Sequence, residues 1–260
     1  MQITAKTWNE YITRLSRLNQ KAGQLMRQYI DTHGTGDADA LITYAAALVT
    51  KYGEGSAELA CQMYDALAEA ANAGVPAAEP AEPADYGEVA RMVNATKNQN
   101  PANLPNGVSR LVKRAGADTT LKNAVRDGAE WAWVPHGDTC PFCITLASNG
   151  WQKASSKVLK GGHAEHIHAN CDCEFAIRFD HNTTVAEYDP EKYLAQYNAA
   201  GGDINKMRRV NYAANKERIN AQKRAAYAAR KLNDIEIGRS IGAKAKNYVV
   251  VDKSTGEEYY

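Results

Sequence analysis

Two pairs of metal-ligating side chains, each pair separated by two residues, lie near the middle of this 260-residue chain. The first stretch, residues 139–151, reads TCPFCITLASNGW, and the second, residues 163–173, reads HAEHIHANCDC. The four residues with this spacing are Cys140, Cys143, His168 and Cys171. A two-residue spacer lets both members of a pair bind one tetrahedral zinc ion. The pattern therefore predicts a small module held together by a structural zinc, which replaces the core that so short a segment lacks.

Cys173 is a fifth candidate ligand and competes with His168. The two-residue spacers favour Cys140, Cys143, His168 and Cys171, while a Cys171/Cys173 pair stays open as an alternative. Two readings without metal also stay open, namely a group of reduced thiols and a pair of disulfides. We expect a reducing cytoplasm, because the N-terminal residues are polar and lack the apolar core of a signal peptide. There a tight Cys/His cluster indicates metal binding before disulfides.

The histidines of the second stretch raise two enzyme alternatives. His163, His166 and His168, with Asn170, resemble the His/Asn/His grouping of zinc-stapled HNH-like nucleases. In those nucleases the residues are spread over a strand, a loop and a helix, whereas here they crowd into one short segment. A cysteine protease would need Cys143 activated by His136 or His166, but a thiol flanked by metal-spaced thiols is more often a ligand.

The first part of the chain is predicted to be helical. It is rich in alanine, and its apolar residues recur at helical spacing from Trp8 to Ile30. A second helix is expected to stop at Gly53 and Gly55, and a third, which carries Cys61 as a small buried residue, to begin after Ser56. The segment GVPAAEPAEPAD, residues 74–85, is predicted to be a semi-rigid extended linker. It divides a helical N-terminal region, residues 1–73, from a C-terminal region, residues 86–260.

The C-terminal region is predicted to hold the Cys/His cluster within residues 130–180. A short helix follows the linker, Asp118 is expected to begin another that Gly128 ends, and EWAWV and CEFAIRF are expected to be strands on either side of the cluster. A long helix is expected over residues 204–232, followed by a short terminal strand. The predicted fold class is therefore α+β, mainly α.

The helix predicted over residues 204–232 is strongly basic, although the whole chain is nearly balanced at 31 Lys+Arg and 30 Asp+Glu. Glu217 is the one acidic residue between Lys206 and Lys231. Such a helix is either a solvated face or a surface for an anionic partner such as DNA. The candidate nucleic-acid contacts are Arg208, Arg209, Lys216, Lys223 and Arg224. No apolar run is long enough to span a membrane, so no membrane partner is expected.

An aromatic strand followed by DTCPFCITLASNG and then HIHANCDCEF resembles the Mu F-like minor head proteins of tailed bacteriophages, in the form found in phages of Actinobacteria. Cys140 and Cys143 match the first half of that family's motif. His168, Asn170, Cys171 and Cys173 match its ending, and Asp172 stands where many relatives have arginine. The resemblance covers about 35 residues, from Cys140 to Cys173.

The resemblance implies a structural component of the phage head that helps to assemble the head. Its expected partners are the portal protein, the major capsid protein and packaged DNA. Its expected place is the head interior or the portal region of the virion, after synthesis in the bacterial cytoplasm. Some relatives are described as capsid maturation proteases, so an enzyme, either such a protease or a nuclease, is the alternative to a non-catalytic role.

Overall fold

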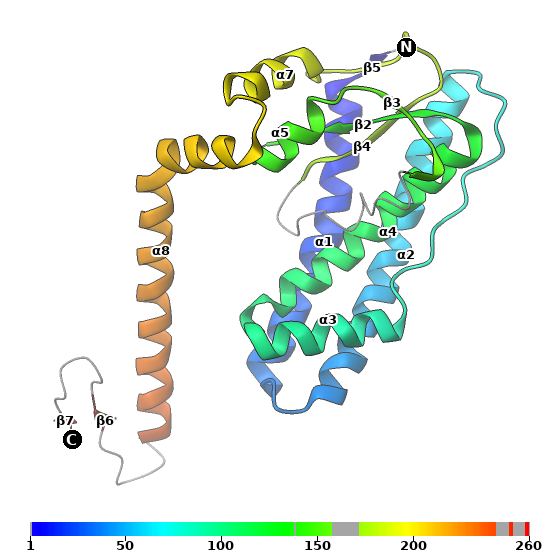
Figure 1. The fold of residues 1–260 in the computed structure, drawn as a ribbon. Coiled ribbons are helices and arrows are strands. Elements are labelled where there is room, and N and C mark those ends of the chain that lie inside the picture. Colours follow the sequence, from blue (N-terminus) through cyan, green and yellow to red (C-terminus); the bar gives the residue numbers. More distant parts are fainter. Residues whose placement is uncertain (1, 138, 158–171, 243–249, 252–257, 260) are drawn as a thin grey trace. The chain divides into compact units, whose positions relative to one another are not determined.

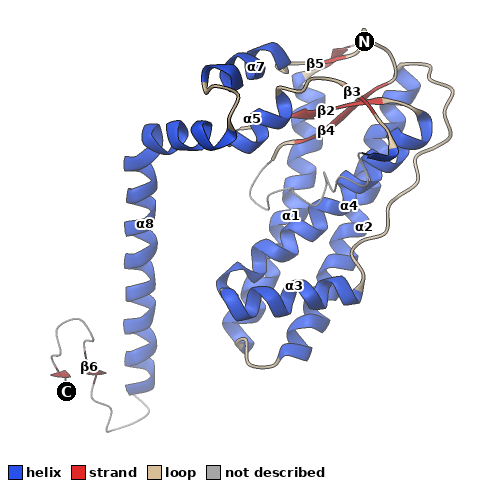
Figure 2. Ribbon diagram, viewed as in Figure 1, coloured by secondary structure: helices blue, strands red, loops and turns tan. Residues whose placement is uncertain are grey.

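A computed structural model of the chain describes residues 2–137, 139–157, 172–242, 250–251 and 258–259 (Figure 1). The chain forms two compact units, Met1–Ile204 and Asn205–Tyr260. Helices dominate both of them, and the strands are short (Figure 2). The predicted fold class, α+β and mainly α, is confirmed.

Three long helices form the body of the first unit: α1 (Ala5–His33), α2 (Ala38–Ala70) and α4 (Leu104–Asp127). They pack against one another in all three pairings. Helices α1 and α2 each start at a capping residue whose side chain accepts a hydrogen bond from a backbone N–H group. The cap is stabilising because the amides in the first turn of a helix have no partner within the helix. Thr4 caps α1 with a 3.1 Å bond from the Thr7 N–H, and Asp37 caps α2 with a 3.0 Å bond from the Ala40 N–H.

The prediction that a helix stops at Gly53 and Gly55 is wrong, because α2 continues through both glycines. Their role is close packing rather than termination. A Cβ added to Gly53 would lie 2.9 Å from the Cβ of Pro83, and one added to Gly55 would lie 3.4 Å from Leu18. Glycine has a low helix propensity, but at these two positions its missing side chain leaves room for neighbouring segments to come close.

The segment after the proline-rich residues is also more helical than predicted. Helix α3 (Tyr86–Gln99) leads through a short 3₁₀ turn, η1 (Pro101–Asn103), directly into α4. Asp118 lies inside α4 and forms an ion pair with Arg114 at 3.6 Å, so the prediction that it begins a helix is wrong. Gly128 ends α4 as predicted, with a left-handed φ of 68°.

A three-stranded antiparallel sheet with the order β3-β2-β4 lies at the end of the helical body away from α3 (Figure 1). Its strands are β2 (Glu130–Val134), β3 (Gln152–Lys153) and β4 (Glu174–Arg178). Helix α5 (Pro141–Ala147) follows β2, and α7 (Pro190–Ala199) packs against α5. Near the start of the chain, β1 (Gln2–Ile3) pairs in parallel with β5 (Thr184–Val185). Strands β2 and β4 occur where the sequence predicted them.

The buried side chains form two hydrophobic clusters. The cluster around the sheet includes Trp131, Trp133 and Phe175, whose rings meet edge to face at centroid distances of 5.3 and 4.7 Å from Phe175. The cluster near α3 includes Met26 and Leu104 and consists mainly of aliphatic side chains. Cys140, Cys143 and Cys173 of the predicted site pack in the aromatic cluster, so the sheet end of the body positions these three.

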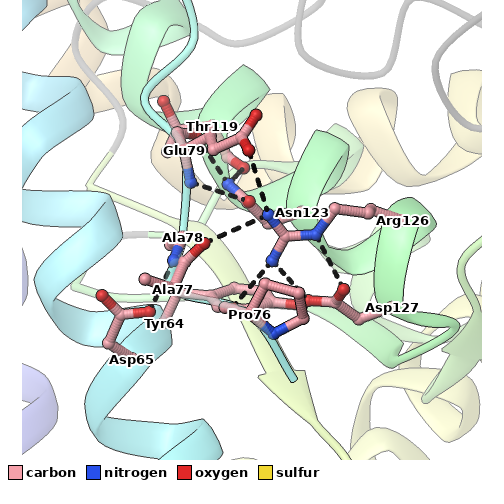
Figure 3. Close-up of polar contacts among 10 residues, drawn as sticks. All are labelled: Tyr64, Asp65, Pro76, Ala77, Ala78, Glu79, Thr119, Asn123, Arg126 and Asp127. Atoms are coloured by element: carbon pink, nitrogen blue, oxygen red, sulfur yellow. Dashed lines mark hydrogen bonds and ion pairs between the residues drawn. The ribbon is translucent and has the colours of Figure 1, made fainter.

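Residues 74–85, called the strap below, run in extended form between α2 and α3 (Figure 1). Side chains of α2 and α4 bind its backbone (Figure 3). Asn123 accepts from the Glu79 N–H at 2.9 Å and donates to the Glu79 carbonyl at 2.8 Å. Asp65 accepts from the Ala78 N–H at 2.7 Å, and Thr119 accepts from the Ala81 N–H at 2.9 Å.

Arg126 of α4 also binds the backbone of the strap, because its guanidinium donates to the carbonyls of Pro76 and Ala77 at 3.0 and 3.1 Å. Asp127 orients the guanidinium through a 2.7 Å bond to Nε, and Tyr64 donates to the same carboxylate at 2.7 Å. The sequence predicted a linker and a domain boundary here. The compact unit Met1–Ile204 instead runs through the strap, because polar side chains of two helices satisfy its backbone.

The second unit contains the predicted basic helix, which extends further than expected as α8 (Ile204–Gly242). Beyond it, β6 (Val250–Val251) pairs antiparallel with β7 (Glu258–Tyr259). The predicted terminal strand is therefore confirmed.

Candidate functional site

Cys140 and Cys143 lie at the start of α5, immediately after the turn that follows β2. Cys140 occupies the N-cap position with extended backbone, and Pro141 begins the helix. This is a favourable place for proline, whose missing N–H would have no helical partner there. Cys143 is buried and Cys140 is half-buried, and both pack with the aromatic cluster of the sheet. The Cys-x-x-Cys turn is thus held between a strand and a helix.

Cys173 immediately precedes β4 and is fully buried. Its sulfur accepts a hydrogen bond from the backbone N–H of His136 at 3.4 Å. His136 lies beyond the end of β2, so this contact joins the turn before α5 to the start of the returning strand. Backbone donors to cysteine sulfur stabilise negative charge on it and are common around metal-bound thiolates.

The other two predicted ligands, His168 and Cys171, lie outside the described residues, as do His163, His166 and Asn170. Within the described ranges, three or more His, Cys, Asp or Glu side chains do not gather into a metal-binding group. Cys140, Cys143 and Cys173 thus share one hydrophobic cluster without forming a three-ligand site. Of the four ligands predicted from the two-residue spacers, the structure therefore describes two, Cys140 and Cys143.

Buried polar groups that the sequence did not single out lie behind Cys173. Lys113 of α4 is 3% exposed and donates to the Cys173 carbonyl at 2.8 Å. Glu174, 1% exposed, accepts from the Phe175 N–H at 3.0 Å. Burial, and next the negative charge of Glu174, raises the pKa of Tyr11 in α1 well above its usual value. Ser16 of α1 also donates to the Asp172 carboxylate.

These contacts tie the residues just before β4, Asp172 and Cys173, to α1 and α4 of the helical body. The sequence carried a signal for Glu174 but not for Lys113. Glu174 is a charged residue among the apolar residues of CEFAI, whereas Lys113 lies beside two other cations, Arg110 and Arg114, in GVSRLVKRAGA. A buried charge requires a polar partner nearby.

The five predicted nucleic-acid contacts all lie on α8, and their side chains are all exposed. They belong to the second unit, so each of the two predicted sites is described within its own unit. Among the described residues, none of the helices is both long enough and apolar enough to cross a membrane.

In the comparison with known protein families, the model described as VG15 protein matches residues 2–200. The chain belongs to the VG15 protein family. The VG15 match spans nearly the whole of the unit Met1–Ile204, including the strap and the cysteine turn, and ends before α8. Neither the curated proteins nor the solved structures contain a match to the chain.

Proposed function

We propose that this VG15 protein is a minor structural protein of a tailed-phage head, acting near the portal or the inner capsid during head assembly. The observation that carries the proposal is the cysteine framework. The Cys-x-x-Cys turn follows β2 and forms the start of α5. Cys173 directly precedes β4, the strand that pairs with β2. This arrangement matches the strand–motif–strand order that the resemblance to Mu F-like minor head proteins implies.

The proposed structural zinc would be held by Cys140, Cys143, His168 and Cys171. One observation favours this set over one that includes Cys173. Among the described residues, Cys173 does not join Cys140 and Cys143 in a three-ligand group. When bound, zinc supplies a rigid tetrahedral link in place of a larger core. Cys173 would instead brace the turn through hydrogen bonding and burial.

The proposed role is non-catalytic. Two of the described cysteines of this framework are buried in the core: Cys143 is 1% exposed and Cys173 is 0% exposed. A nucleophilic cysteine needs an exposed, electropositive setting. The buried position of Cys143 therefore supports a ligand role over that of a protease nucleophile.

The test is co-expression of the chain with the portal and major capsid proteins encoded in the same phage genome, followed by purification of the assembled heads. The wild-type chain should be present in the heads in few copies, and Cys140→Ser/Cys143→Ser should reduce its incorporation. Cys61→Ser, which alters a buried cysteine of α2 far along the chain, is the matched control and should be incorporated normally.

Three outcomes would contradict the proposal. The first is absence of the wild-type chain from heads that assemble equally well without it. The second is capsid protein trimmed only when the chain is present, which would identify a protease. The third is cutting of plasmid DNA by the purified chain with added magnesium or manganese, provided that His166→Ala abolishes it, which would identify a nuclease.

A further inference from the structure

Helix α8 presents a strongly basic surface in a part of the chain that the VG15 match does not reach. Seven Lys and Arg side chains are described between residues 204 and 228, all of them exposed, against one acid, Glu217. The seven are Lys206, Arg208, Arg209, Lys216, Arg218, Lys223 and Arg224. An inference from this helix is therefore independent of the proposed head function.

Three of these cations fall on one line along the helix. Arg209, Lys216 and Lys223 are seven residues apart, which in an α-helix places them about 10 Å apart along the axis with a drift of only about 20° per step. Tyr212 and Tyr227 lie in the same sector, about 60° wide at 100° per residue. We call these five residues the basic stripe.

Both tyrosines of the basic stripe are exposed, Tyr212 by 45% and Tyr227 by 71%. The one acid between residues 204 and 228, Glu217, lies about 110° from the centre of the stripe. Glu217 lies on the same side of the helix as Lys206 and Arg224, which are about 60° beyond the edge of the stripe. Between residues 204 and 228 the stripe is thus a line of cations and phenol groups with no carboxylate in its own sector.

The composition of the stripe selects among partners. It lacks the large aliphatic side chains that a helix needs to pack on a protein groove or to enter a membrane surface. A second copy of the same stripe would meet it with like charge. A line of cations flanked by hydroxyl donors instead suits a partner with regularly repeated negative charge, since Lys, Arg and Tyr side chains are common donors to phosphate oxygens.

We propose that the basic stripe of α8 binds the phosphate backbone of duplex DNA. An α-helix with its side chains is about 10–12 Å across, and the major groove of B-DNA is about 12 Å wide, so the helix fits along the groove. Arg209, Lys216 and Lys223 contact phosphates, and Tyr212 and Tyr227 add hydroxyl donors. Binding is independent of sequence, because phosphate contacts carry no base information.

The experiment is fluorescence anisotropy of the full chain with a labelled duplex at 25 to 200 mM salt. Three neutralised phosphates give a log–log slope of about −2.7 and a fall in affinity of roughly 300-fold over this range. The triple variant Arg209→Gln/Lys216→Gln/Lys223→Gln should lose most of this slope. The control Lys206→Gln/Arg218→Gln/Arg224→Gln removes the same charge from other faces of α8 and should keep it.

Circular dichroism at 222 nm should show equal helix content in both triple variants. Tyr212→Phe/Tyr227→Phe should weaken binding by a few-fold without changing the slope. Equal losses in the two triple variants would overturn the proposal in favour of a diffuse charge effect. No salt-dependent binding by the wild type would assign the helix to solvent or to an acidic protein, and tighter binding to a single strand than to the duplex would overturn the duplex assignment.

Discussion

Replacing Asn123 by leucine should make the strap open more often while leaving the helices in place. Asn123 of α4 is 2% exposed and satisfies both backbone groups of Glu79, one through Oδ1 and the other through Nδ2. Nδ2 also donates to the carbonyl of Thr119 in the preceding turn at 2.8 Å. Leucine has a similar size but forms none of these bonds.

The magnitude follows from the two bonds that cross from α4 to the strap. Each contributes about 0.5–1.5 kcal/mol net, so the closed strap loses about 1–3 kcal/mol. That change raises the population of the open strap by about 5- to 150-fold. The remaining contacts from Asp65, Thr119 and Arg126 should still hold the strap in most molecules.

The assay is limited digestion by elastase, which cuts after small residues, because Ala77, Ala78 and Ala81 lie in the strap and none of them precedes proline. When the strap opens and closes faster than it is cut, the cleavage rate follows the open population. The wild type should resist cutting there, and Asn123→Leu should be cut about 5- to 150-fold faster. Lys122→Leu, at the neighbouring exposed position of α4, is the control and should behave as the wild type.

Two results would refute this reasoning. One is a wild-type strap cut as fast as a free peptide of the same sequence, which would make residues 74–85 an open linker. The other is an unchanged cleavage rate in Asn123→Leu. Hydrogen exchange of the strap amides at the same temperature separates local opening from a general loss of stability.

Three further predictions concern packing, pH and thiol reactivity. Gly116→Ala should lower the free energy of unfolding by about 1–3 kcal/mol in a denaturant titration. The added Cβ would lie 2.7 Å from the Oγ and 3.1 Å from the carbonyl oxygen of Ser56 in α2, so a neutral or stabilising result would refute the close packing. A hydrogen bond from Arg114 lowers the pKa of Glu88, so the pair stabilises the fold above the unfolded carboxyl pKa of about 4.3 and loses this effect as pH falls through the folded value. Glu88→Gln should therefore lose less stability than the wild type between pH 5 and pH 3, and identical curves would contradict the pairing. Burial raises the pKa of the Cys61 thiol to about 11, so iodoacetamide at pH 8 should leave it unmodified in the native chain and label it in denaturant; rapid native labelling would refute its burial.

The sequence was sufficient for elements whose residues carry a strong local pattern. The apolar spacing from Trp8 to Ile30 predicted α1, and the aromatic and β-branched residues of EWAWV and CEFAI predicted β2 and β4. Cys61 was expected to be a small buried residue and is one. In each case the side chains that define the local pattern are also those that enter the core.

The failures come from residues whose role depends on distant neighbours. Gly53 looked like a helix end but allows Pro83 of the strap to approach α2. Asp118 looked like a cap, yet it pairs with Arg114 inside a longer helix. Asn123 gave no signal at all, because its two bonds to Glu79 join segments 44 residues apart. Glycine and short polar residues serve in both local and tertiary roles, and the sequence around them does not distinguish the two.

The candidate site was predicted in part. The position of Cys140 and Cys143 between a strand and the rest of the module follows from their spacing and from the aromatic run before them. The buried bracing by Lys113 and by the His136 N–H was not predicted, because it depends on how α4 and the turn after β2 pack against Cys173. His168 and Cys171 lie outside the described residues, so their place in the site stays a prediction.

Metal content tests the central claim, a zinc-stapled module in a structural head protein, most directly. Elemental analysis of the full chain purified without chelator should give about one zinc per chain, as four ligands of this type bind one ion. Cys140→Ser should lose the zinc and lower the unfolding midpoint, whereas Cys173→Ser should keep the zinc. A wild-type chain that is fully folded, incorporated into heads and free of zinc would contradict the account.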